Sequence, residues 1–195
     1  MTDFLRPNSS ELEFLSLSYN KFYDIYEEVM EVNDTFWQKE PYYRFSKVNV
    51  LFSIYAELLN YAPLKYVLIE MESKRPPNES KIAKELFKCI RNILAHFPFY
   101  ETWNNVYINT GLVNWYKDGM TIDKFLRKNE GNEEIKYRFW DSQKKKMTYL
   151  SINFPKDYTE GKNIYLKDIL NEKDGIQFSA ILMKQVLDTQ VLQMH

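Results

Sequence analysis

Residues 82–98, which run IAKELFKCIRNILAHFP, decide the fold. Their apolar members recur at steps of three and four, the spacing that gathers side chains on one face of an α-helix. At about 100° per residue they form one stripe roughly 140° wide, so we predict a helix from about Glu79 to Phe97 with this stripe facing the core. Pro98 disfavours helical geometry at the preceding residue and ends the helix. The stripe consists of Ile82, Ala83, Leu86, Phe87, Ile90, Ile93, Leu94 and Phe97.

Two further long helices are predicted upstream. Ser10 followed by Glu13 fits a capping box, in which the two side chains satisfy backbone amides of the first turn. From there an apolar stripe runs over 12–32, and a second stripe follows Pro41 over about 43–61. Both stripes keep the helical period, so both segments are expected to pack against the helix at 82–98.

The connection between the second and third helices leaves two choices open. The apolar run Leu64–Met71 suits either a short helix or a strand, and we favour the short helix. Either Asn78 or Ser80 can cap the helix that follows.

Beyond Pro98 the pattern changes to short alternating runs, which are typical of hairpins. One hairpin is predicted for Val106–Ile108 with Leu112–Trp115, around Asn109-Thr110-Gly111, and another for Ile135–Trp140 with Met147–Phe154. The remaining predictions are a short helix over Thr121–Lys128, a strand over Asn163–Ile169 and an amphipathic helix over Gly175–Gln193.

Together these segments predict a mainly α fold, an up-and-down helical bundle with a small β-hairpin subdomain inserted before the C-terminal helix. A chain of 195 residues suits one domain, 1–195. Within it we expect a helical core over 9–98, a β-containing insertion over 104–170 and the C-terminal helix over 174–194.

Composition limits the functions that this fold can carry. The net charge of −1 provides no overall basic field, so any nucleic-acid contact must be local. The lone Cys89 cannot form an internal disulfide, and two histidines without a Cys-x-x-Cys spacing argue against a zinc site. We therefore expect neither metal nor cofactor. The N-terminus lacks an apolar signal segment, and no stretch is apolar enough to span a membrane, so a cytoplasmic location is expected.

Several polar residues of the 82–98 helix lie off its core stripe. His96 lies about 110° from the centre of the stripe, on the flank that also carries Glu85, Cys89 and Asn92. Because Asn92 and His96 are four residues apart, the amide can orient the imidazole ring. The opposite flank carries the cations Arg91, Lys84 and Lys88.

Arg91-Asn92-x-x-x-His96 resembles the motif of the HEPN superfamily of ribonucleases, an Arg, four to six intervening residues and a His, often with a polar residue after the Arg. The resemblance implies a helical bundle that dimerises and a metal-independent cleavage of RNA. It assigns catalytic roles to Arg91, Asn92 and His96. The pattern covers only the helical part of the chain and does not explain residues 104–170.

The chemistry of RNA cleavage suits these residue types. A 2′-OH attacks the adjacent phosphate, so the site needs proton transfer near neutral pH, which His96 can supply, and a planar cation on the phosphorane, which Arg91 can supply. Lys84 and Lys88 are candidates for contacting the RNA backbone. Such an activity would suit a toxin or defence effector. A further possible partner is therefore an antitoxin or regulatory protein.

Residues five apart on a regular helix point about 140° apart, so Arg91 and His96 need help to meet at one phosphate. The long Arg91 stem can reach around the helix, or the last turn can unwind at Phe97-Pro98 so that His96 swings. A second subunit can also provide the missing partner, and a two-fold axis supplies two histidines. We therefore predict a homodimer whose cleft includes Glu85, Asn92 and His96.

Other interpretations of the same residues remain open. His96 can be a helix-end residue that satisfies terminal carbonyls, and Arg91 can be an ion-pair partner of Glu85 or of another acidic neighbour. The alternative function is a catalytically silent HEPN-like module that binds RNA or a protein. Lys144–Lys146 is interpreted as a solubilising turn. Packing, rather than base stacking, is expected for Trp103, Trp115 and Trp140.

Overall fold

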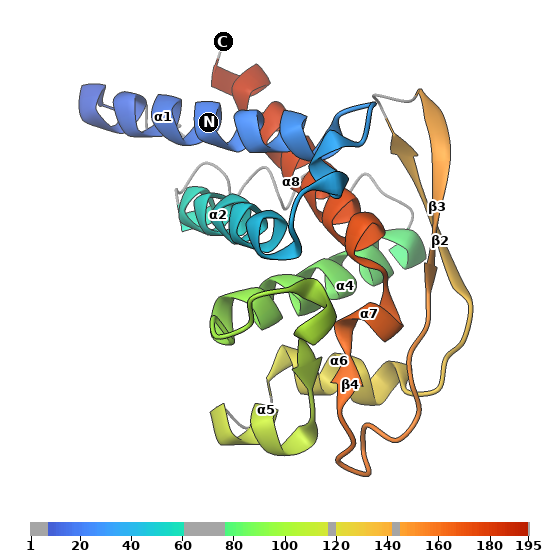
Figure 1. Ribbon diagram of the computed structural model, residues 1–195. Coiled ribbons are helices and arrows are strands. Elements are labelled where there is room, and N and C mark those ends of the chain that lie inside the picture. Colours follow the sequence, from blue (N-terminus) through green and yellow to red (C-terminus); the bar gives the residue numbers. More distant parts are fainter. Residues whose placement is uncertain (1–7, 61–76, 117–119, 142–144, 195) are drawn as a thin grey trace.

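The computed structural model describes residues 8–60, 77–116, 120–141 and 145–194. Three long helices, α1 (Ser9–Met30), α2 (Pro41–Asn60) and α4 (Pro77–His96), lie one above another, and α8 (Glu172–Met194) crosses them (Figure 1). A small set of antiparallel strands precedes α8. The predicted fold class, a mainly helical protein with a small β element before the C-terminal helix, is confirmed.

Helix α1 begins two residues earlier than predicted. Its capping box uses Asn8 and Glu11 instead of Ser10 and Glu13: the Glu11 amide donates to Asn8 Oδ1 (3.0 Å), and the Asn8 amide donates to Glu11 Oε2 (2.7 Å). The helix ends at Met30, before the predicted Val32, and a short 3₁₀ helix, η1 (Thr35–Gln38), follows. Its buried face consists of Leu15, Tyr19, Phe22, Ile25, Tyr26, Val29 and Met30.

Prolines occupy the first positions of α2 and α4. At that position the missing N–H costs nothing, because the first amides of a helix have no intrahelical acceptor. Asn78 and Ser80, the two predicted caps, therefore lie inside α4. The helix runs from Pro77 to His96, so it begins two residues before the predicted Glu79 and ends one residue before the predicted Phe97. The run Leu64–Met71 lies outside the described residues.

Helix α4 packs between α2 on one side and α6 (Thr121–Asn129) on the other. Phe87 lies against Phe52 and Tyr55 of α2, with ring centroids 6.1 and 5.7 Å apart. Toward α6, Lys128 Nζ contacts Glu85 Oε2 at 2.8 Å. One cluster of buried apolar side chains extends from α1 through α4 and the strands to α8, so the strand region shares its core with the helices.

Strands β2 (Ile135–Asp141) and β3 (Lys146–Ile152) form the predicted second hairpin. Its inner face carries Tyr137, which lies 5.5 Å from the ring of Phe178 in α8. Its outer face includes the opposed pair Trp140 and Met147. The hairpin thus covers one side of the helices with its inner face alone.

The predicted first hairpin is wrong. Thr110–Tyr116 is a helix, α5, because Asn109 caps it: its Oδ1 accepts from the Leu112 amide at 2.7 Å. β1 (Tyr107–Ile108) instead pairs with β4 (Ile164–Tyr165), far along the sequence. Only these two residues of the strand predicted over 163–169 are extended, and α7 (Leu166–Ile169) follows directly.

The tryptophans divide between the core and the surface. Trp103, in the 3₁₀ helix η2 (Trp103–Asn105), is 1% exposed and donates from Nε1 to the Leu170 carbonyl at 2.9 Å. Packing was predicted for Trp115 and Trp140 as well, but they are 84% and 52% exposed. Neither ring has the buried environment that composition suggested.

Candidate functional site

Arg91, Asn92 and His96 lie on the last two turns of α4, and all three are half-buried. The helix stays regular to its end: the Phe97 amide donates to the Ile93 carbonyl at 3.0 Å. The last turn is therefore not unwound, and of the three ways to bring Arg91 and His96 together, the swing at Phe97-Pro98 is excluded for this conformation.

Arg91 lies on the side of α4 that faces α2. Burial raises the pKa of Tyr55 in α2, and the charge of Arg91 opposes that rise, which places the guanidinium near this phenol. Arg91 Nη2 also donates to Asn92 Oδ1 at 3.2 Å. The Asn92 oxygen that was expected to orient His96 thus accepts from Arg91. An amide oxygen has two lone pairs and can accept a second hydrogen bond as well.

The other flank of α4 packs against α6 of the same chain. Glu85 pairs with Lys128, so the suggested Arg91–Glu85 ion pair is wrong. Cys89 is 1% exposed, and burial raises its pKa to about 12, which keeps the thiol protonated and unreactive. A dimer cleft that includes Glu85, as predicted, would have to form beside α6.

The directions of Arg91 and His96 follow from the regular helix. Residues five apart point about 140° apart, so Arg91 faces the α2 side while His96 belongs to the flank of Glu85 and Cys89. Lys84 and Lys88, the predicted backbone contacts, are half-buried along the same helix. Two ways to complete the site thus remain: the long Arg91 stem can reach around the helix toward His96, or a second chain can provide the missing partner.

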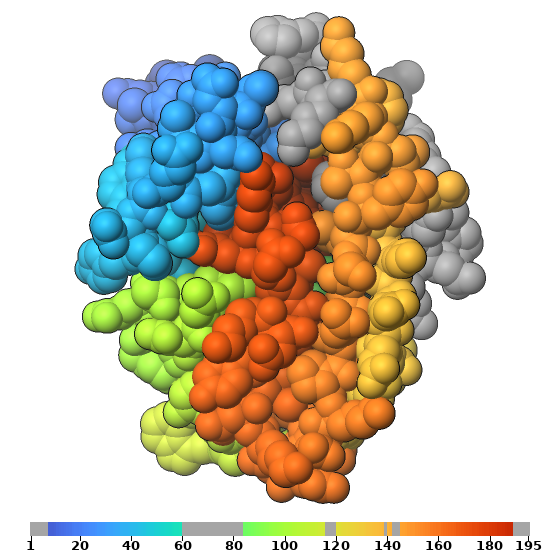
Figure 2. All heavy atoms as spheres, turned by 45° about the vertical axis from the view of Figure 1, so that its right-hand side comes forward, coloured from blue at the N-terminus to red at the C-terminus, as the bar shows by residue number. Residues whose placement is uncertain are grey.

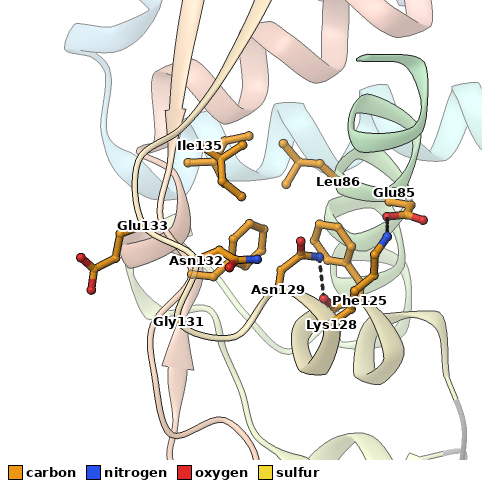
Figure 3. Close-up of a pocket in the computed structure, with 11 residues that line it drawn as sticks. Glu85, Leu86, Phe125, Lys128, Asn129, Gly131, Asn132, Glu133 and Ile135 are labelled. Atoms are coloured by element: carbon orange, nitrogen blue, oxygen red, sulfur yellow. Dashed lines mark hydrogen bonds and ion pairs between the residues drawn. The ribbon is translucent and has the colours of Figure 1, made fainter. Parts of the chain in front are cut away.

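A pocket of about 560 Å³ opens where α4, α6 and the base of the β2–β3 hairpin meet (Figure 3). Leu86, Phe125 and Ile135 form apolar walls, and the Lys128–Glu85 pair lies at its edge. The volume falls within the usual range for small-molecule sites. Sequence analysis missed it, because it depends on how three distant segments pack.

One buried polar cluster was also missed. Asp123 is 8% exposed and accepts from the Tyr158 hydroxyl at 2.9 Å and from Arg127 Nε at 2.9 and 3.0 Å. Burial and this carboxylate both raise the pKa of Tyr158. The i,i+4 spacing of Asp123 and Arg127 was a local signal, but Tyr158 lies too far along the chain for the sequence to connect it. The cluster joins α6 to the segment before β4.

Two general properties concern the described residues only. None of the described helices is both long and apolar enough to cross a lipid bilayer. No group of three His, Cys, Asp or Glu side chains in these parts of the chain is arranged to hold a metal ion.

Comparison of the chain with protein-family models, curated protein sequences and solved structures finds no match. The resemblance to HEPN ribonucleases therefore depends on residues 91–96 and on their setting at the end of a helix.

Proposed function

We propose that the protein is a metal-independent endoribonuclease whose site contains Arg91, Asn92 and His96 and is completed by a second copy of the chain. The observation that supports this most is their position: all three are partly accessible at the end of an unbroken helix, away from its core stripe. Polar residues that only stabilise the fold would be expected among the contacts between helices, as Asp123 is.

The proposed chemistry needs two proton transfers and one cation. One imidazole takes the proton of the 2′-OH as this oxygen attacks phosphorus. A second imidazole gives a proton to the departing 5′-oxygen as its bond to phosphorus breaks. Arg91 holds two phosphate oxygens with its planar fork, which stabilises the charge of the phosphorane. The products carry a 2′,3′-cyclic phosphate and a 5′-OH. If His96 provides both imidazoles, the site requires two chains, because each chain has one His96.

A second candidate is a catalytically silent helical module that binds RNA or a protein. Two observations favour it: Arg91 and His96 of one chain point in different directions from α4, and the Glu85 flank of that helix packs against α6. The two candidates differ in what a purified protein does to RNA, since only the first produces new ends.

The experiment is incubation of the purified protein with mixed RNA, with and without EDTA, followed by end-group analysis. We expect cleavage in both conditions, with cyclic phosphate ends. His96→Ala and Arg91→Ala should each lower the rate by about 10²- to 10⁴-fold, and Asn92→Ala by less. Arg91→Lys should also be impaired, because an ammonium cannot reproduce the bidentate fork.

The chain's other histidine provides a matched control. His195→Ala should cut RNA at the parent rate. If EDTA stops cleavage, or if His96→Ala cuts as well as the parent, the ribonuclease proposal fails and the silent module replaces it.

Dominant inhibition tests the requirement for a second chain. An excess of His96→Ala protein draws parent chains into mixed dimers, which have one His96 where the proposed cleavage needs two. We expect this excess to lower the rate of the parent, whereas an equal excess of His195→Ala protein should not lower it. A monomer in sedimentation at micromolar concentration, or an unchanged rate with excess His96→Ala protein, would contradict the composite site.

A further inference from the structure

The outer face of the β2–β3 hairpin exposes large side chains. Trp140, Met147 and Tyr149 are 52%, 45% and 62% exposed, whereas Tyr137 and Leu150 on the inner face are buried. In the strand register Trp140 lies opposite Met147, and Tyr149 is the next residue of β3 on that face. The two aromatic rings are thus diagonal neighbours, within reach of one continuous ligand.

The exposed charges of the two strands themselves have one sign, and the nearest exposed carboxylates along the chain, Glu133 and Glu134, lie before β2. Lys136 and Arg138 are exposed on the same outer face, and Lys145 is exposed where β3 begins. Among hairpin residues 135–141 and 145–152 the single carboxylate is Asp141, which is 2% exposed and belongs to the inner face. In a chain with a net charge of −1, the outer face is a local basic surface.

We propose that this outer face binds single-stranded RNA, with bases stacked on Trp140 and Tyr149 and phosphates held by Lys136 and Lys145. Aromatic rings among cations suit a partner that offers flat rings on a polyanionic backbone. A duplex keeps its bases stacked inside and cannot offer them to these rings. An acidic protein would satisfy the cations but would not explain two exposed aromatic rings side by side.

The placement of the hairpin links this surface to the candidate site. The hairpin lies at the end where α4 begins, and Figure 2 shows its strands, yellow to orange, extending over one side of the molecule. Arg91 and His96 lie toward the other end of α4, a helix about 30 Å long. A bound strand that reaches them would run along α4, past Lys84 and Lys88. The claim that the bound strand is the substrate rests on the proposed ribonuclease function, whereas binding itself does not.

Binding is measured by fluorescence anisotropy with a labelled oligouridylate, in a His96→Ala background that prevents cleavage. Trp140→Ala and Tyr149→Ala should each weaken binding by about 5- to 150-fold, the loss expected for one stacked base. Trp140→Phe should retain most of the affinity, because it keeps a ring. Trp115→Ala, which removes a more exposed tryptophan elsewhere, should have no effect.

Salt dependence tests the contribution of the cations. Lys136→Ala should reduce the slope of log affinity against log salt by about 0.7, the value for one phosphate contact on a single strand. Lys124→Ala, which removes an exposed cation on α6, should leave the slope unchanged.

Three results would overturn the proposal: Trp140→Ala binding as well as the parent, a duplex binding as tightly as the single strand, or Trp140→Ala changing the oligomeric state, which would make this face a contact between chains. Its failure is distinguishable from failure of the proposed function. Binding that depends on Trp140, without cleavage by the parent, refutes the ribonuclease alone. Cleavage by the parent, with binding unchanged by Trp140→Ala, refutes the hairpin surface alone.

Discussion

Two regions of the molecule use their polar residues differently. We call one region the closed side, and it comprises the buried residues Cys89, Asp123, Tyr158 and Trp103; the last three make hydrogen bonds to other parts of the chain. At what we call the helix end, Arg91, Asn92 and His96 remain partly accessible. The difference separates residues that hold the fold from residues placed to act on a partner, and it predicts opposite effects of substitution.

The largest loss of stability is expected on the closed side for Gly175→Ala. An added Cβ would lie 2.6 Å from two ring carbons of Trp103, a fully buried ring that its hydrogen bond to Leu170 fixes in place. We expect the free energy of unfolding to fall by about 3 kcal/mol in chemical denaturation.

Gly111→Ala is the matched control, because its Cβ would meet Asn109 Oδ1 at 3.4 Å and no ring. In a helix that substitution should be neutral or should stabilise by up to about 1 kcal/mol. Equal effects of the two substitutions would contradict the tight contact at Trp103.

Asp123→Ala should be the next most damaging change. It leaves the buried Tyr158 hydroxyl without its acceptor, so we expect a loss of about 2 kcal/mol in the free energy of unfolding. Glu133→Ala removes the exposed ion pair with Lys156 and should cost less than about 1 kcal/mol. If the two variants unfold at the same denaturant concentration, the Asp123 cluster does not stabilise the closed side.

Local signals in the sequence explain how much of this architecture could be predicted. The long helices and the β2–β3 hairpin follow from apolar periodicity, which depends on neighbouring residues. The first hairpin was mispredicted because Asn109-Thr110-Gly111 suits a turn as well as a helix start, and the capping bond decides between them. The capping box of α1 was predicted two residues too late, because Asn8 with Glu11 and Ser10 with Glu13 have the same spacing and both fit the pattern.

The candidate site was less accessible to sequence analysis than the fold. The positions of Arg91 and His96 off the core stripe follow from the helical period, and the regular helix agrees with them. The occupation of the Glu85 flank by α6, the pocket beside it and the exposure of Trp140 depend on contacts between distant segments. No local pattern in one sequence contains that information.

The pH dependence of stability provides a smaller test of the closed side. Burial raises the pKa of Cys89 to about 12, above the value of about 8.5 for an unfolded thiol. The unfolded state therefore loses this proton first, and the stability that Cys89 contributes falls as pH rises from about 8.5 toward 12. Burial, followed by the charges of Asp141 and Asp188, raises the pKa of Tyr26 to about 12 and acts in the same direction.

The measurement is the free energy of unfolding against pH for the parent and Cys89→Ala. The parent should lose more stability than the variant across this alkaline range. The native thiol should also stay unreactive toward a disulfide reagent until the protein unfolds. Parallel pH curves, or a rapid reaction in the native state, would contradict the burial of Cys89.

The smallest effects on stability are expected at the helix end. Arg91→Ala, Asn92→Ala and His96→Ala remove partly accessible side chains off the core stripe, so each should change the free energy of unfolding by no more than about 0.5 kcal/mol. A loss as large as that of Asp123→Ala would assign these residues to the fold and remove the contrast between the two regions.

The most direct test of the central claim is the cleavage of RNA in EDTA by the parent and His96→Ala proteins, compared at equal concentration and with end groups identified. We predict that the parent produces 2′,3′-cyclic phosphate and 5′-OH ends without metal, while the folded His96→Ala protein is slower by about 10²- to 10⁴-fold. Equal rates for the two proteins, or no cleavage by the parent, would contradict it.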